Sequence, residues 1–164
     1  MDFVIFISIF IVQRLSELFI AKRNEKWLRQ KGAVEYGQNH YPFIILLHIL
    51  FILSLIIEYI EKADLHIDFI FLSIFIVLIS LKIWVISSLG KFWNTKIFRV
   101  PGILPIRKGI YKLLRHPNYV IVLLEFIVVP LVFHLYYTAI IFSFLNALML
   151  WLRIKEEERV WNIT

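Results

Sequence analysis

Long apolar blocks alternate with short polar segments along the chain, and each block is long enough to form a membrane helix. The first three blocks each have the length of one crossing. The last block, residues 119–152, is too long for one crossing, and Pro130 near its middle predicts a break into a helical hairpin. The period-two alternation of a β-barrel strand is absent. The pattern predicts an all-α polytopic membrane bundle of five membrane-embedded helices, at about residues 3–20, 43–60, 69–89, 119–132 and 136–152.

Composition agrees with a membrane protein of one domain, spanning residues 1–164. Hydrophobic residues make up 60% of the 164 positions. The net charge of +6 does not indicate nucleic-acid binding, because the basic residues lie in loops between apolar blocks. The absence of cysteine excludes disulfides, thiolate metal sites and cysteine nucleophiles. A cleaved signal peptide is not expected, because the first block carries Asp2 at its start and runs on through Arg14 and Glu17.

Loop charges predict an orientation for the bundle. The loops at 22–41 and 91–118 and the tail after residue 152 are basic, whereas the loop at 58–68 carries four acids against Lys62. Because positively charged loops stay in the cytoplasm, we expect the N-terminus outside and the C-terminus inside.

Two polar clusters flank the predicted hairpin. The first is GIYKLLRHPNY, from Gly109 to Tyr119, and the second is RIKEEER, from Arg153 to Arg159. Ionisable residues next to the membrane are costly and tend to be functional. Since a hairpin returns its ends to one side, we expect both clusters to line a single site on the cytoplasmic face.

The spacing within these clusters resembles that of the isoprenylcysteine carboxyl methyltransferase family. The resemblance rests on Gly109-x-Tyr111, on Arg115-His116-Pro117-x-Tyr119, and on an arginine followed after three residues by a glutamate pair. The segment QRLSELFIAKRNEKW from residue 13 to 27 looks like a bacterial subgroup of the family. The resemblance implies a bacterial inner-membrane enzyme that uses S-adenosyl-L-methionine.

The resemblance also implies roles for individual residues. Tyrosine rings offer π faces to a sulfonium, an arginine can hold a carboxylate, and a glutamate can bind an ammonium or a ribose. The residues expected to be catalytic are Arg153, Glu157 and Glu158. The residues expected to bind the cofactor are Gly109, Tyr111, Arg115, His116, Pro117, Tyr119 and Glu158. The residues expected to meet the acceptor are Glu125 and Trp151, and no metal site is expected.

Several assignments have alternatives. Arg115 and His116 could be interfacial anchors that reach lipid headgroups. An acid inside an apolar run should face the bundle interior with a partner, and for Glu125 we consider Lys82 and His134. Arg14 and Glu17, spaced i and i+3, are expected to pair with each other.

The sequence therefore predicts an O-methyltransferase that acts on a carboxylate or hydroxyl of a lipophilic acceptor dissolved in the membrane. The subgroup resemblance suggests an alkylpyrone-type polyketide lipid. The expected partners are this small molecule and membrane lipids, without nucleic acid; the oligomeric state stays open. Two alternatives remain: a membrane reductase that acts on lipid double bonds with a nicotinamide cofactor, and a small transporter or scaffold whose basic loops bind anionic lipid.

Overall fold

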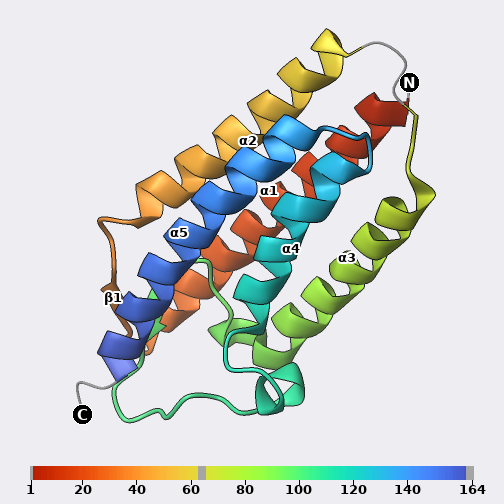
Figure 1. Ribbon diagram of the computed structural model, residues 1–164. Helices are drawn as coiled ribbons and strands as arrows, with labels where there is room; N and C mark the ends of the chain where they lie inside the picture. Colours follow the sequence, from red (N-terminus) through yellow and green to blue (C-terminus); the bar gives the residue numbers. More distant parts are fainter. Residues whose placement is uncertain (1, 63–65, 162–164) are drawn as a thin grey trace.

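The fold is known from a computed structural model that describes residues 2–62 and 66–161. The all-α bundle predicted from the sequence is confirmed (Figure 1). Four helices in the described ranges are long and apolar enough to cross a membrane, and a shorter apolar helix, α4, accompanies them. The helices are α1 (Asp2–Gln30), α2 (Tyr41–Glu61), α3 (Phe69–Leu89), α4 (Pro117–Leu131) and α5 (Tyr136–Trp161).

Two helices continue well past the predicted membrane segments. Helix α1 ends at Gln30 instead of near residue 20, and α5 ends at Trp161 instead of near residue 152. Neither extension contains glycine or proline, and α1 keeps one face buried there through Asn24 and Leu28. The ends of the predicted domain and part of the acidic loop (residues 1, 63–65 and 162–164) lie outside the described residues.

The predicted hairpin is confirmed. Helix α4 stops at Leu131, just after Pro130, and α5 starts at Tyr136. In the turn between them, His134 adopts a left-handed conformation, with φ 54°. The carboxylate of Glu58 on α2 accepts hydrogen bonds from the first amides of α5, at 3.2 Å from Tyr137 N and 2.7 Å from Thr138 N. An acid at this helix start satisfies amides that have no partner within the helix.

A small antiparallel sheet, which the sequence pattern did not predict, closes the opposite end of the bundle. Strand β1 (Val34–Tyr36) pairs with β2 (Ile97–Arg99), with Glu35 opposite Phe98. The 3₁₀ turns η1 (Gly90–Phe92) and η2 (Gly109–Lys112) lie in the same connection as β2. Figure 1 shows β1, this connection and the end of α5 together at the end away from the N-terminus.

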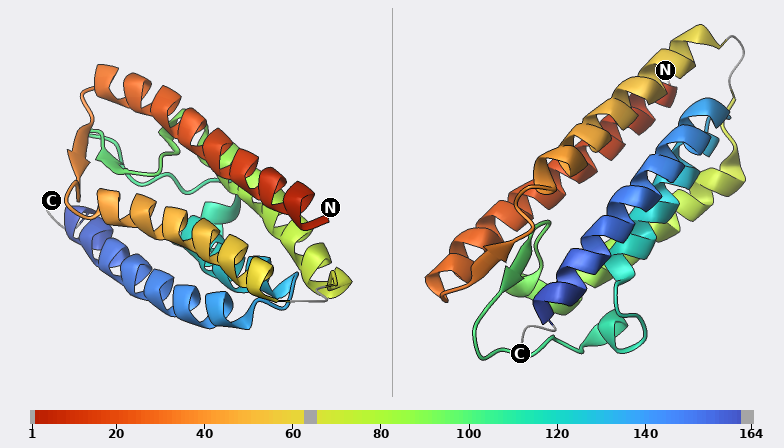
Figure 2. Two further views of the ribbon diagram at one scale, coloured as in Figure 1. Left: turned by 90° about the horizontal axis from the view of Figure 1, so that it is seen from above. Right: turned by 60° about the vertical axis from the view of Figure 1, so that its left-hand side comes forward.

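Aromatic side chains fill the interior between the helices. Phe10 of α1, Phe51 of α2 and Phe126 of α4 are fully buried, and the rings of Phe51 and Phe126 stack at a centroid distance of 4.2 Å. Helix α4 lies between α3 and α5 (Figures 1 and 2). Many aliphatic side chains of α1, α2, α3 and α5 remain exposed, as expected of helices that face lipid.

Candidate active site

The hairpin places the start of α4 beside the end of α5, and the two polar clusters meet there. The hydroxyl of Tyr119 donates a hydrogen bond to Oε2 of Glu157 at 2.5 Å. The same hydroxyl accepts one from Nε of Arg153 at 2.9 Å. Residues 34 and 38 positions apart in the sequence thus form one chain of hydrogen bonds.

Arg153 is held in place by the connection between α3 and α4. Its Nη2 donates to the carbonyl oxygen of Thr95, and its guanidinium carbon lies 5.5 Å from the centroid of the Tyr119 ring. The hydroxyl of Thr95 in turn contacts the hydroxyl of Tyr41 at 3.1 Å. The segment next to the small sheet therefore fixes the direction in which Arg153 reaches Tyr119.

His116 and Arg115 face the carboxylates of Glu157 and Glu158 on α5. The ring of His116 stacks on that of Tyr119, with centroids 5.4 Å apart and planes 13° apart. Its Nδ1 lies 3.7 Å from Oε2 of Glu157, and its Nε2 lies 4.0 Å from Oε1 of Glu158. Arg115 pairs with Glu158 at 3.1 Å, and this pair is more exposed than the contacts of Glu157.

A cavity of about 640 Å³ opens beside these residues, a size typical of small-molecule sites. Helices α3, α4 and α5 and the connection from Phe92 to His116 contribute to its wall. The structure brings together in this wall all the predicted catalytic and cofactor residues except one: Tyr111, Arg115, His116, Pro117, Tyr119, Arg153, Glu157 and Glu158.

Gly109 is the exception. It is not among the residues of the cavity wall, and a Cβ atom built on it would lie 2.2 Å from Oγ of Ser88 on α3. Its φ of 54° lies in the left-handed region that glycine adopts without strain. Gly109 thus lets the turn η2 approach α3 closely, and this approach positions Tyr111 in the cavity wall.

The phenol of Tyr111 is neutral in this environment. Burial, and after it the negative charge of Glu157, raise the pKa of Tyr111 above that of an ordinary phenol. A protonated hydroxyl can donate a hydrogen bond to a ligand in the cavity.

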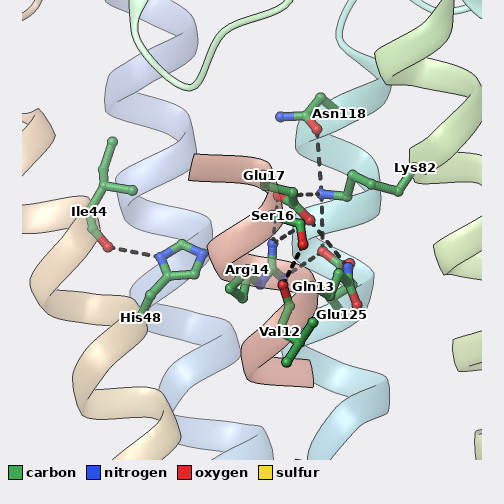
Figure 3. A network of polar contacts seen from close by, with 10 residues as sticks. All are labelled: Val12, Gln13, Arg14, Ser16, Glu17, Ile44, His48, Lys82, Asn118 and Glu125. Carbon is green, nitrogen blue, oxygen red and sulfur yellow. Dashed lines mark hydrogen bonds and ion pairs between the residues drawn. The ribbon is translucent and has the colours of Figure 1, made fainter. Parts of the chain in front are cut away.

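The two residues predicted to meet the acceptor lie elsewhere. Glu125 is fully buried between α1, α3 and α4, where Arg14 contacts it at 2.7 Å and Lys82 at 3.2 Å (Figure 3). Of the two partners considered for Glu125, Lys82 contacts it, whereas His134 lies in the turn after α4 and contacts Tyr136. Trp151 is 54% exposed on α5, with Nζ of Lys155 3.8 Å from its ring centroid. Neither Glu125 nor Trp151 lines the cavity.

The pairing of Arg14 with Glu17 is also confirmed, at 3.2 Å, but it is only part of a larger set. Arg14 reaches Glu125 as well, and Gln13 donates to Glu125 at 2.8 Å. The isolated pair predicted from helix spacing is therefore a buried network across three helices (Figure 3).

Sequence reasoning missed further wall residues. Trp93 is almost completely buried and Asn118 is half-buried, and both line the cavity. Asn118 occupies the unspecified position of the His-Pro-x-Tyr spacing, so the motif gave no reason to select it. Trp93 is held by its carbonyl oxygen, which accepts a hydrogen bond from Asn24 of α1 at 2.7 Å. No local sequence pattern predicts such a contact between distant segments.

The model of the Isoprenylcysteine carboxyl methyltransferase (ICMT) family matches residues 70–162, which include both clusters and the hairpin between them. The chain belongs to this family. Membership makes the protein a membrane methyltransferase in general terms. The matched region begins within α3, so α1 and α2 lie outside it.

Two bacterial proteins resemble the chain over most of its length. Uncharacterized protein YpbQ of Bacillus subtilis (strain 168) is 43% identical over 160 residues, covering 96% of this chain and 95% of that protein. An uncharacterized protein of Haemophilus influenzae (strain ATCC 51907 / DSM 11121 / KW20 / Rd) is 34% identical over 149 residues, covering 88% and 86%. The similarity thus includes α1 and α2. No solved structure matches the chain.

Proposed function

We propose that the protein transfers a methyl group from S-adenosyl-L-methionine to an oxygen atom of a lipophilic acceptor. The observation that carries this proposal is the hydrogen-bonded set of Arg153, Tyr119 and Glu157, which joins the two family motifs in the wall of one cavity. Membership of the methyltransferase family supports the reaction class.

The donor groups of the cavity fit this cofactor. Nε2 of His116 is buried and has no hydrogen-bond partner among the described residues, so a polar ligand would satisfy it. The carboxylates of Glu157 and Glu158 would hold an ammonium or ribose hydroxyls, and Arg115 would hold a carboxylate. The rings of Tyr111 and Tyr119 would face a cationic sulfonium. The bound cofactor would supply an electrophilic methyl group.

The residues of the chain contribute orientation more than proton transfer. A lone pair of the acceptor oxygen would form the new O–C bond as the C–S bond of the cofactor broke, and the electron pair of that bond would stay on sulfur. The positive charge on sulfur and the negative charge on the acceptor oxygen would be neutralised together. A positioned and poorly hydrated site favours such a reaction. Arg153, which is fixed by Thr95 and Tyr119, keeps the two motifs in register.

We infer that the acceptor is lipophilic and reaches the cavity from the bilayer, because the described chain consists of apolar helices with a small polar end. An alkylpyrone-type polyketide lipid, whose ring carries both a hydroxyl group and an alkyl chain, belongs to this class. Label from [methyl-³H]S-adenosyl-L-methionine should enter the organic phase when the protein is incubated with total lipid extract of Bacillus subtilis. Base would release the label of a methyl ester as methanol, whereas the label of a methyl ether resists base.

Cofactor binding is the direct test. Isothermal titration of the detergent-solubilised protein should detect S-adenosyl-L-methionine and no binding of NADPH, which a reductase would require. His116→Ala should weaken the binding, and Lys22→Ala, which changes an exposed residue of α1, should not. Binding of NADPH alone would replace this proposal with the reductase. Equal affinity of the His116 variant and the wild type for S-adenosyl-L-methionine would indicate that His116 is an interfacial anchor and not a cofactor ligand.

The two clusters should also behave as one unit. His116→Ala and Glu157→Gln combined should reduce methyl transfer by less than the product of their separate factors, because both changes affect one contact set. A scaffold whose basic loops bind lipid would instead show independent, salt-sensitive effects.

We further propose that this site faces the cytoplasm of a bacterial cell, with the N-terminus outside. Loop charges support this orientation, and both relatives are bacterial. Because the chain has no native cysteine, Lys62→Cys and Lys108→Cys can be labelled one at a time with a membrane-impermeant maleimide. Labelling of intact cells only at position 62 is expected, and labelling only at position 108 would reverse the orientation.

A further inference from the structure

A buried ion network lies deeper in the bundle than the cavity. It consists of two cations, two carboxylates and one amide from three helices, and Figure 3 shows these side chains converging. Lys82 of α3 lies 3.2 Å from Glu125 of α4 and 3.7 Å from Glu17 of α1, and Arg14 contacts both carboxylates. The buried ion network is therefore Gln13, Arg14, Glu17, Lys82 and Glu125.

None of these five residues lines the cavity, but one side chain connects the two. Nζ of Lys82 lies 3.4 Å from Oδ1 of Asn118, and Asn118 is part of the cavity wall. Asn118 directly precedes Tyr119 on α4, and both residues line the cavity.

The contact with Lys82 determines which way the amide of Asn118 points. An ammonium group can only donate hydrogen bonds, so it selects the amide oxygen and turns the amide nitrogen away. Figure 3 shows this arrangement, with Oδ1 toward Lys82 and Nδ2 on the far side. Within residues 2–62 and 66–161, Nδ2 has no hydrogen-bond partner. The N–H groups of Asn118 are thus available to donate hydrogen bonds to a ligand in the cavity.

The charge behind Asn118 adds to this preference. Lys82 is 2% exposed, and its Nζ lies 3.2 Å from Glu125 and 3.7 Å from Glu17. Because the ammonium group polarises the amide through its oxygen, the N–H groups of Asn118 become stronger hydrogen-bond donors, which suits an oxygen atom with negative charge.

We propose that Asn118, oriented by Lys82, binds the anionic oxygen of the methyl acceptor, and that the buried ion network serves to hold Lys82 in this position. Asn118 is the residue that touches the acceptor, and Lys82 is a positioning residue. The subsite takes a lipophilic molecule with an ionised carboxylate or enol. This inference rests on the proposed function, because it places the acceptor oxygen beside the residues that would hold the cofactor.

The test uses cis-parinaric acid, a fluorescent fatty acid, and its methyl ester as matched charged and neutral probes. Binding to the full-length protein in phosphatidylcholine nanodiscs is measured by energy transfer from tryptophan to the probe. Only the energy transfer that excess dodecanoic acid abolishes is counted as specific binding, because the probe also dissolves in the lipid. The wild type should bind the acid about tenfold more tightly than the ester, as expected for a hydrogen bond to a charged group. Absence of this difference in the wild type would refute the subsite.

Asn118→Asp is the decisive variant, because it keeps the oxygen that contacts Lys82 and replaces the N–H donor with a second oxygen. It should abolish the preference for the acid. Asn39→Asp makes the same change in an exposed turn before α2 and should keep the preference. Asn118→Ala removes the donor without adding charge, and it should lose the preference too. Retention of the preference in either Asn118 variant would overturn the proposal.

The role of Lys82 is tested by the same measurement. Lys82→Met should lose the preference for the acid, and Lys82→Arg should restore part of it, whereas a purely structural lysine would affect thermal stability alone. A wild type that shows the Asn118-dependent preference but does not bind S-adenosyl-L-methionine would retain the subsite and refute the methyltransferase proposal. Binding of S-adenosyl-L-methionine without any preference for the acid would refute the subsite and leave the methyltransferase proposal intact.

Discussion

Removal of one charge from the buried ion network should destabilise the bundle. The wild-type network is neutral, since Arg14 and Lys82 oppose Glu17 and Glu125. Glu125→Gln keeps the volume of the side chain but leaves two cations against one carboxylate in the membrane interior. The new amide can also offer only one oxygen where the carboxylate accepts from Arg14, Lys82 and Gln13.

The size of the effect follows from this imbalance. Loss of one partner from a buried ion pair costs about 3–5 kcal/mol, chiefly because the remaining charge lies unpaired away from water. For a chain of this length each kcal/mol lowers the melting temperature by about 2–4 °C. Glu125→Gln should therefore lower it by roughly 10 °C. The double variant Glu125→Gln/Lys82→Met restores neutrality, with Arg14 opposite Glu17, and should recover at least half of this loss.

Thermal unfolding in detergent, followed by tryptophan fluorescence, measures both effects. Glu61→Gln is the matched control, because Glu61 is exposed at the end of α2, and surface substitutions usually change stability by less than about 0.5 kcal/mol. A melting temperature of the Glu125 variant within 2 °C of the wild type would refute the reasoning. So would a double variant that loses as much as both single variants added together.

Three further changes test other parts of the structure. Gly109→Ala should lower stability by about 1–3 kcal/mol in the same assay, since its Cβ would meet Ser88 and its φ is left-handed; an unchanged melting temperature would contradict the close approach. Tyr119→Phe keeps the ring and removes the hydroxyl bonded to Glu157, so methyl transfer should fall about 10- to 100-fold without loss of fold, and full activity would contradict its role. Glu58→Gln should cost about 1–2 kcal/mol, because a charged acceptor at the start of α5 is lost; equal thermal stability would show that the amide replaces it.

The sequence predicts those features that depend on local pattern. Apolar blocks identify the membrane helices, and Pro130 identifies the hairpin, because helix length and proline geometry act within a few residues. The sequence did not predict the ends of α1 and α5, because the polar residues there are compatible with either a helix or a loop. Tertiary contacts, such as that of Asn24 with Trp93, select the helix. Strands β1 and β2 are three residues each and pair across more than 60 positions, so no periodicity is present to detect.

The candidate site shows the same division. Motif spacing and the hairpin bring Tyr119, Arg153 and Glu157 to one place, and the structure contains this arrangement. The buried ion network was not predicted, because the i, i+3 spacing of Arg14 and Glu17 is satisfied equally well by a pair on the surface of an isolated helix. Only the packing of α1 against α3 and α4 reveals that this pair meets Lys82 and Glu125.

The antiparallel hairpin explains how helices of different length form one site. Side chains on a helix tilt toward its N-terminus. On α4 this direction leads out of the bundle toward the polar end, whereas on α5 it leads back from that end into the bundle. Tyr119, near the start of α4, and Glu157, near the end of α5, therefore point toward each other and meet at 2.5 Å.

The lengths of the two helices then fix where this meeting point lies. Helix α4 has 15 residues and spans about 22 Å at 1.5 Å per residue, less than a hydrocarbon core of about 30 Å. Helix α5 has 26 residues and spans about 39 Å, so its last turns extend past the start of α4. A short helix paired with a long one thus places the contact of Tyr119 with Glu157 at the end of the shorter helix, within the last turns of the longer one. Under the proposed function, a water-soluble methyl donor and a lipid-dissolved acceptor would both have to reach this depth, which a hairpin of two full-length helices would not offer.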